Sequence, residues 1–257
     1  MQRSNTYIII FSAVLTIILG GLLAISAIGL KPMQDMQVAL DTQKKILGAV
    51  MDVQPTDDIP AIYQERIQSL VVDSQGEEIT EVDGATVTAE SIDVGKQFKL
   101  PAEDRLYPVY KFMGENSDEV EAYILPVYGN GLWDNIWGYI ALESDMETIR
   151  GVVFDHAGET PGLGARITTI EVQERFKGKK IYDDLGELVA VRMVKGEGGD
   201  PSIYNNNEVD GMSGATITAT GVNNMLQKYL GYYEPYLEQA SGKDVKKPES
   251  KSQYTDV

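Results

Sequence analysis

Two glycine-rich segments contain the residues of this chain whose types and spacing could do chemistry. The first is Val209 to Thr218, V-D-G-M-S-G-A-T-I-T. Its two glycines and small side chains allow a large group to approach the main chain, and backbone amides near a helix start can face an anion. A threonine hydroxyl here could accept a phosphoryl-type bond if another enzyme activates the donor. The alternative is a surface turn that caps a helix.

The second segment, E-T-P-G-L-G from Glu159 to Gly164, follows His156 closely. Pro161 fixes its φ angle, whereas Gly162 and Gly164 free the backbone after it. Such a loop can lie close to a flat ligand. An ordinary connector between two elements is the alternative.

Composition narrows the classes of function. The 257 residues are 43% hydrophobic and 24% charged, which is typical of globular proteins and excludes disorder over most of the length. The net charge of −17 argues against nucleic-acid binding. The lack of cysteine excludes disulfides, thiolate nucleophiles and cysteine-ligated metals. The single histidine, His156, excludes a site with several histidine ligands from one chain.

An uncharged run from Tyr7 to Leu30 predicts one membrane-spanning helix. Its length of roughly 36 Å, at about 1.5 Å per residue, is enough to cross a bilayer core. A cleaved signal peptide is the alternative, but its apolar region is usually shorter, about 7–15 residues. Arg3 before the run and Lys31 after it leave the orientation open. Gly20 and Gly21 would allow close contact with other helices in the membrane.

The rest of the pattern predicts an α+β domain on a helical stalk. Apolar residues at helical spacing predict a helix that continues from the anchor, and a second helix is expected over Ala61 to Leu70. After Thr216, the apolar residues from Val222 to Leu230 recur at helical spacing and predict an amphipathic helix. Thr218 or Thr220 could cap its start. Other elements are expected as short β runs at 71–80, 81–89, 106–113, 120–128, 136–143, 149–156 and 188–194, loops at 129–131, 158–164 and 196–202, and a short helix at 168–176. We therefore divide the chain into an anchor (1–31), a helical stalk (32–69), an α+β domain (70–240) and a polar disordered tail (241–257).

Both glycine-rich segments resemble the motifs of one family. The S-G-A-T segment resembles the flavinylation motif of FMN-binding domains, D-G-x-[ST]-G-A-[ST], and E-T-P-G-L-G resembles the companion loop of the same domain. G-L-W at Gly131 to Trp133 and the run 136–143 resemble the C subunit of the Na⁺-translocating NADH:quinone oxidoreductases. The apolar span, a long insertion and then the three motifs follow one another in the same order as in this family, and the resemblance covers nearly the whole chain. The G subunit of the ferredoxin-linked Rnf complex shares only the last two motifs and is the closest alternative.

The resemblance implies a fold and a cofactor site. The fold is a single-pass N-terminal transmembrane helix plus one soluble FMN-binding domain. FMN is joined through its phosphate to Thr216, and no position of the motif is broken. The motif's other residues fall on Asp210, Gly211, Ser213, Gly214 and Ala215. The flavin ring would lie against the loop of Glu159, Thr160, Gly162, Leu163 and Gly164.

The resemblance also implies a function and partners. The chain would carry electrons within an inner-membrane complex that oxidises NADH, reduces quinone and pumps Na⁺ outward, and it would not be active alone. Its partners would be the other subunits, a flavin transferase for maturation, and the bilayer through Tyr7 to Leu30, with the soluble domain periplasmic. No dinucleotide-binding fingerprint of the strand–G-x-G-x-x-G–helix type is present, so the chain itself is not expected to bind NADH. A membrane-anchored scaffold without flavin is the alternative from a different class.

Several other residues have a functional and a structural interpretation. Thr86, in D-G-A-T-V-T, echoes the flavinylation motif but lacks its Ser-Gly pair, so a strand with a turn is expected there. His156 could donate a proton near a reduced flavin or be structural. Trp133 and Trp137 could pack on the flavin, on a partner or in the core. The acidic residues at 183–184 and 115–121 are expected to be solvated faces, without the ligand spacing of a calcium or magnesium site.

Overall fold

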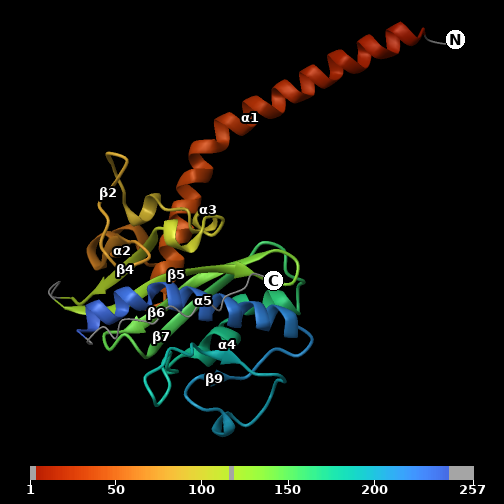
Figure 1. Ribbon diagram of the computed structural model, residues 1–257. Coiled ribbons are helices and arrows are strands. Elements are labelled where there is room, and N and C mark those ends of the chain that lie inside the picture. Colours follow the sequence, from red (N-terminus) through yellow and green to blue (C-terminus); the bar gives the residue numbers. More distant parts are fainter. Residues whose placement is uncertain (1–3, 116–118, 243–257) are drawn as a thin grey trace. The chain divides into compact units, whose positions relative to one another are not determined.

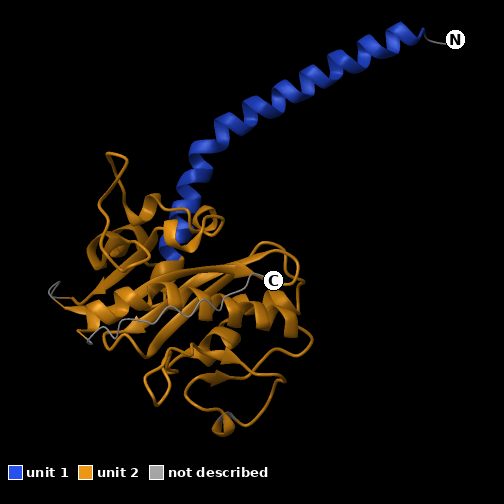
Figure 2. Ribbon diagram, viewed as in Figure 1, with its two compact units in different colours: residues 1–44 blue, residues 45–257 orange. Residues whose placement is uncertain are grey.

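A computed structural model describes residues 4–115 and 119–242 (Figure 1). The predicted polar tail lies outside these ranges except for residues 241 and 242. The chain divides into two compact units, residues 1–44 and 45–257 (Figure 2). The second unit thus begins before residue 70, because Ile46 and Leu47 are already buried in it.

The first unit is formed by α1 (Asn5–Gly48), which continues into the second unit at its last turn. Among the described residues, α1 is the one helix that is long and apolar enough to cross a bilayer, with a mean hydropathy of 2.8 in its most apolar window. The helix runs without interruption through Pro32. The prediction of a helix that continues beyond the apolar run is therefore confirmed.

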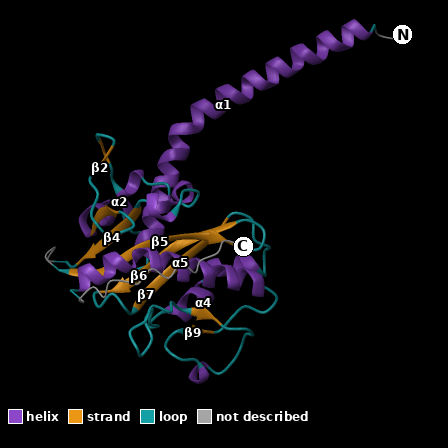
Figure 3. Ribbon diagram, in the orientation of Figure 1, coloured by secondary structure: helices purple, strands orange, loops and turns teal. Residues whose placement is uncertain are grey.

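The second unit is built on a five-stranded antiparallel sheet in the order β1-β4-β5-β6-β7 (Figure 3). The pairing runs from Ile67↔Phe112 in the first pair to Ile136↔His156 in the last, with register shifts after Phe112 and after Ala141. The strands are β1 (Ile67–Val72), β4 (Tyr107–Met113), β5 (Val120–Asn130), β6 (Asn135–Glu143) and β7 (Ile149–His156). The β-branched and aromatic runs expected at 106–113, 120–128, 136–143 and 149–156 form β4, β5, β6 and β7, whereas most of β1 lies in the segment expected to be a helix.

Successive side chains of a strand point to opposite faces of the sheet. In this sheet, other parts of the chain cover both faces. Tyr107 and Val109 belong to the core against α5 (Thr216–Ser241), which lies along β5 and β6 (Figure 1). On the other face, Arg66 stacks over the Phe112 ring, with 4.2 Å from Cζ to the ring centroid. The segment after α1 also covers this face, where the backbone of Gly151 touches Ala49 so closely that a Cβ would overlap its carbonyl.

The remaining elements are short. Before β4 come α2 (Ile59–Arg66), β2 (Glu81–Val82), β3 (Ala85–Thr86), η1 (Ala89–Ser91), α3 (Val94–Gln97) and η2 (Ala102–Asp104). After β7 come η3 (Gly164–Thr168), α4 (Ile170–Gln173), η4 (Glu174–Phe176), β8 (Arg192–Met193), η5 (Pro201–Ile203) and β9 (Glu208–Val209). The mixture of helices and sheet confirms the predicted α+β class, and the short helix expected at 168–176 is present as α4 and η4.

Three predicted boundaries were wrong. The helix expected to reach Leu70 ends at Arg66, because Ile67 begins a strand that pairs with β4. The loop expected from Gly129 starts only after Asn130, which still pairs with Asn135. The strand expected over 188–194 is reduced to β8, because Ala190 has a φ of 54°, which interrupts extended backbone.

The predicted cap of the C-terminal helix was also wrong. Ala215 precedes the first helical residue, Thr216, and its side chain makes no capping hydrogen bond. The Thr218 hydroxyl donates to Glu159 instead, and the Thr220 hydroxyl donates to the carbonyl of Thr216. Both threonines therefore lie too far inside the helix to cap it.

Candidate functional site

The fold brings the two glycine-rich segments together. The first runs from β9 into α5, and the second leads from β7 into η3. Leu163 of the second segment approaches Gly214 of the first so closely that its Cδ2 would lie 3.0 Å from a Cβ added there. Ser213, Gly214 and Thr216 are exposed, together with Thr160, Gly162 and Leu163. These six predicted site residues are thus open to solvent on two segments that meet at Leu163 and Gly214.

Thr216 is exposed at the uncapped start of a helix of 26 residues. In the described part of the chain, the backbone N–H groups of Thr216, Ile217 and Thr218 donate no hydrogen bond. The first backbone hydrogen bond of the helix is donated by Ala219, to Ala215. Free N–H groups and the helix dipole make such an end suitable for a phosphate group.

Glu159, in contrast, is buried, with 4% of its surface exposed. Its Oε1 accepts hydrogen bonds from the backbone N–H groups of Leu132 (2.7 Å) and Trp133 (3.0 Å). Its Oε2 accepts one from the hydroxyl of Thr218, at 2.6 Å. We call this group the Glu159 cluster: Glu159, Thr218 and the backbone of Leu132 and Trp133. It joins three segments, the G-L-W turn, the E-T-P-G-L-G loop and the first turn of α5.

The Glu159 carboxylate stays ionised although it is buried. Burial by itself would raise the pKa of Glu159, but the hydrogen bonds from the Thr218 hydroxyl and the two backbone amides outweigh it and hold the pKa below its ordinary value. Two motif glycines lie directly against the carboxylate. A Cβ on Gly131 would overlap Oε1, and a Cβ on Gly164 would overlap Oε2 and the Thr218 hydroxyl. These glycines are therefore needed for the close approach of backbone to carboxylate.

A second carboxylate holds the segment before Thr216. Glu197 accepts two hydrogen bonds from the Arg166 guanidinium and one from Arg175 Nη2, at 3.0 Å. Its Oε2 also accepts the backbone N–H of Ser213, at 2.8 Å. Arg175 in turn donates to the carbonyl of Gly211, at 2.6 Å. We call Glu197, Arg166 and Arg175 the Glu197 cluster. The hydrogen bond from Arg166, followed by that from the Ser213 amide, lowers the pKa of Glu197 to about 2.

Asp210, predicted as a motif residue, is bound within the chain. Its Oδ1 accepts a hydrogen bond from the Tyr204 hydroxyl at 3.0 Å, and its Oδ2 accepts one from the Gly198 amide. Gly211 and Ala215 are buried, and a Cβ on Gly211 would overlap the carbonyl of Val194. These three residues therefore shape the segment, whereas Ser213, Gly214 and Thr216 form its open side.

The other predicted candidates have different surroundings. Trp133 is 70% exposed, beside the Glu159 cluster, whereas Trp137 is half-buried and stacks on Tyr128, with 6.4 Å between the ring centroids. His156 accepts the backbone N–H of Glu159 through Nδ1, at 3.2 Å. Thr86 lies in the β2–β3 hairpin, whose two-residue turn has positive φ angles at Asp83 and Gly84. The predicted strand and turn at Thr86 are confirmed.

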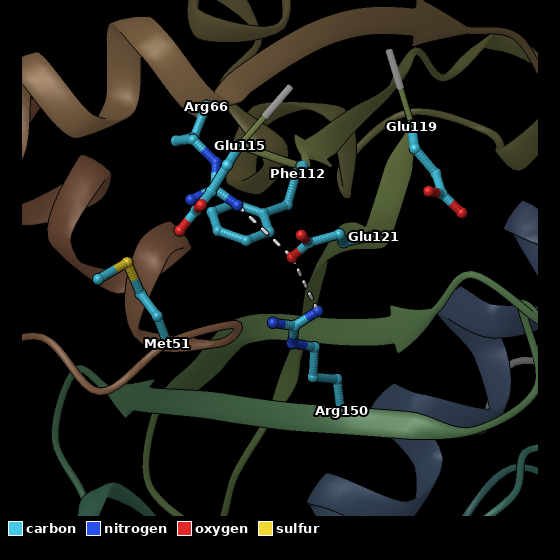
Figure 4. A pocket seen from close by; sticks show the side chains of 8 residues that line it. Met51, Arg66, Phe112, Glu115, Glu119, Glu121 and Arg150 are labelled. Atoms are coloured by element: carbon cyan, nitrogen blue, oxygen red, sulfur yellow. Dashed lines mark hydrogen bonds and ion pairs between the residues drawn. The ribbon is translucent and has the colours of Figure 1, made fainter. Parts of the chain in front are cut away.

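A hollow of about 740 Å³ lies elsewhere in the second unit (Figure 4). Glu121 lies between the guanidinium groups of Arg66 and Arg150, with Phe112 beside them. None of the motif residues lines this hollow. Arg66 and Arg150 both pair with Glu121 there, and the motif residues lie instead around Thr216.

Four residues of the site were not recognised in the sequence as its supports: Arg166, Arg175, Glu197 and Thr218. Thr218 was considered only as a helix cap. Arg166 follows the E-T-P-G-L-G loop by two residues, and Glu197 is an acidic residue within the glycine-rich run 196–199. A single charge within a run of glycines is the one signal in the sequence that suits a residue with a partner, and it does not show which partner.

The fold and the site define a class, a membrane-anchored protein with an FMN-binding domain. Residues 131–231 match the FMN-binding domain family, and this range includes both motifs and Thr216 but not Thr86. The chain is 31% identical over 249 residues to the C subunit of the Na(+)-translocating NADH-quinone reductase of Yersinia pestis, covering 90% of each chain. It is 33% identical to the corresponding C subunit of Neisseria meningitidis serogroup B, covering 91% of this chain and 93% of that one.

Solved structures agree with these relatives. The crystal structure of the C subunit of the Na(+)-translocating NADH-quinone reductase from Parabacteroides distasonis has a TM-score of 0.67 and 34% identity, covering 81% of this chain and 96% of that chain. The chain therefore belongs to the family of C subunits of the Na⁺-translocating NADH-quinone reductases. The resemblance seen in the sequence is confirmed, and FMN is the cofactor that its matched domain binds.

Proposed function

We propose that this chain carries FMN covalently on Thr216 and passes electrons between other subunits of a membrane complex that oxidises NADH, reduces quinone and pumps Na⁺ outward. The observation that carries the proposal is the exposed Thr216 hydroxyl at the uncapped start of α5, within an unbroken flavinylation motif. Its relatives are named as subunits of such a reductase. When bound, FMN supplies the electron-carrying chemistry.

The attachment is a substitution at phosphorus. The Oγ1 of Thr216 forms a bond to the phosphate of an activated FMN donor, the donor's leaving group departs, and the hydroxyl proton leaves with it. The net addition to the chain is FMN less one water. A flavin transferase must activate the donor, because the Thr216 hydroxyl has no hydrogen-bond partner among the described residues that could act as its base. The free amides of Thr216 and Ile217 would then hold the phosphodiester's negative charge.

The exposed apolar side chains around Thr216 suit the flavin ring. Ile217 is 59% exposed, Leu163 42% and Trp133 70%. Leu163 is next to Gly214, and Trp133 is joined to the first turn of α5 through Glu159. These three residues belong to the segments that meet at Thr216, and contiguous exposed apolar side chains are typical of a ligand site. We propose that the ring packs against these residues.

The covalent site is tested by mass. The full chain, expressed with a flavin transferase, is expected to gain the mass of FMN less one water on the peptide that contains Thr216. Thr216→Ala should remove this addition and Thr86→Ala should keep it. An unmodified wild-type chain, with the transferase active on a control substrate, would leave the anchored scaffold as the better interpretation.

The place in the complex is tested by what co-purifies. The intact complex should accept electrons from NADH and contain the other reductase subunits. Reduction by ferredoxin instead would favour an Rnf-type complex.

We propose that α1 anchors the chain in the inner membrane with the second unit in the periplasm. The natural chain contains no cysteine, so single cysteines can report the orientation. Glu65→Cys, on an exposed position of α2, should react with a membrane-impermeant maleimide in intact spheroplasts, whereas Ser4→Cys should react only after lysis. The opposite pattern would place the second unit in the cytoplasm.

A further inference from the structure

We infer that Glu159 is a positioning residue whose buried, unpaired charge lowers the reduction potential of the flavin, and not a ligand of the cofactor. The inference rests on the proposed covalent site at Thr216. It reassigns a motif residue that the sequence placed against the flavin ring.

Glu159 is not available for direct contact with a cofactor. Both carboxylate oxygens already accept hydrogen bonds from the protein, and only 4% of the residue's surface is exposed. The glycines on either side leave no room for another group, because even a Cβ on Gly131 or Gly164 would overlap the carboxylate. The contacts of Glu159 are therefore contacts within the chain.

These contacts hold the surface around Thr216. Thr218 lies two residues after Thr216 in the first turn of α5, and its hydroxyl is bound to Glu159 Oε2. The backbone N–H groups of Leu132 and Trp133 are bound to Oε1, so Glu159 ties the G-L-W turn to the same helix start. Apart from tyrosines, Thr218 and Glu159 are the two buried residues with polar or charged side chains in the described ranges, and they are bonded to each other.

The charge of Glu159 is not neutralised by a cation. In the described ranges, no lysine or arginine forms an ion pair with Glu159, and its three hydrogen-bond donors are two amides and a hydroxyl. His156 is the titratable group that acts on it electrostatically. Buried charges are screened by solvent much less than surface charges. Reduction adds negative charge to a flavin, so a fixed carboxylate near the attachment point disfavours reduction.

Two variants separate the charge from the hydrogen bonds. Glu159→Gln removes the charge and can keep the contacts: the amide oxygen accepts from the two backbone N–H groups, and the amide nitrogen donates to the rotated Thr218 hydroxyl. Thr218→Val keeps the charge and removes the hydrogen bond to α5. Glu65→Gln removes one charge from an exposed position of α2 and is the matched control.

The measurement is a spectroelectrochemical titration of the flavinylated full chain, with iodide quenching of flavin fluorescence as the second readout. Glu159→Gln should raise the midpoint potential, with a shift that persists at high ionic strength, and should leave quenching near the wild-type value. Thr218→Val should raise the quenching constant and shift the potential much less. Glu65→Gln should change neither quantity.

The outcomes that overturn the inference are specific. Equal shifts of potential in Glu159→Gln and Thr218→Val would show that packing, and not charge, sets the potential. No shift in Glu159→Gln would show that the carboxylate is too distant or too well screened. Thermal unfolding of each variant identifies one that has lost its fold. Failure of the proposed function is distinguishable, because the wild-type chain would then carry no flavin to titrate.

Discussion

Two carboxylates bind the chain on either side of Thr216, and the groups that hold them differ in charge. Glu159, on the side of α5, is buried and receives hydrogen bonds from neutral groups alone. Glu197, on the side of Ser213, is bound by two guanidinium groups and keeps 18% of its side chain exposed. The position of Glu159 depends on close packing, because two backbone N–H groups and the Thr218 hydroxyl hold it and two glycines lie against it. That of Glu197 depends on charge and is therefore sensitive to pH and salt.

Removal of the buried carboxylate should have the largest effect on stability. Glu159→Ala leaves two backbone amides and the Thr218 hydroxyl without acceptors in a buried site. We expect a loss of about 3–5 kcal/mol in the free energy of unfolding. Urea unfolding of the full chain in detergent measures it, with Glu65→Ala as the control at an exposed position. A loss no larger than that of Glu65→Ala would show that the Glu159 cluster contributes little to stability.

Gly164 and Gly162, in the E-T-P-G-L-G loop that contains Glu159, should differ in how much a substitution costs. A methyl group on Gly164 would overlap Glu159 and Thr218, so Gly164→Ala should cost about 3 kcal/mol and loosen the Glu159 cluster. Gly162 has a φ of 77° but open space around its Cα. Gly162→Ala should therefore cost only the backbone strain, about 1 kcal/mol. Thermal unfolding of both variants gives the ranking. If Gly162→Ala were the more damaging, backbone strain would outweigh close approach in this loop.

The contribution of Glu197 to the free energy of unfolding should depend on pH. Because the pKa of Glu197 is lowered to about 2 from an ordinary value of 4.5, its contribution is complete above pH 4.5 and is lost as the pH falls towards 2. Glu197→Gln should cost about 1–2 kcal/mol at pH 7. Its difference from the wild type should shrink between pH 4.5 and 2, and also at high salt. Unfolding curves across this range check it, and a difference that is independent of pH would exclude an ionic contribution.

The sequence predicted more of the site than of its supports. The motif residues from Asp210 to Thr216 and the E-T-P-G-L-G loop are continuous in the chain, so their resemblance to the motifs of the family is visible in the sequence. The Glu197 cluster joins residues 166, 175 and 197, and its pairing depends on how η3, η4 and the 196–199 loop are folded against each other. Local patterns contain no information on such pairs.

The same reasoning explains the errors in the fold. The sheet strands with long β-branched runs were predicted, because alternation along one strand is a local signal. The end of α2 at Arg66 was not, because Ile67 joins the sheet only through its pairing with β4. Glu159 was recognised as part of a motif, but its burial became visible only when Gly131 and Thr218, far away in the sequence, were seen to surround it.

The smallest effect on stability is expected at Thr216 itself, between the two carboxylates. Its side chain is exposed and its hydroxyl makes no hydrogen bond in the described ranges, so Thr216→Ala should change the free energy of unfolding by less than about 0.5 kcal/mol. The same variant should lose all covalent flavin. The wild-type chain without flavin is unfolded in parallel with Thr216→Ala, so that the difference measures the loss of the threonine side chain alone. A large destabilisation there would mean that Thr216 supports the fold, and that loss of flavin in this variant could not be assigned to the missing hydroxyl. If stability is unchanged, the two carboxylates hold the segment and Thr216 is left free to react.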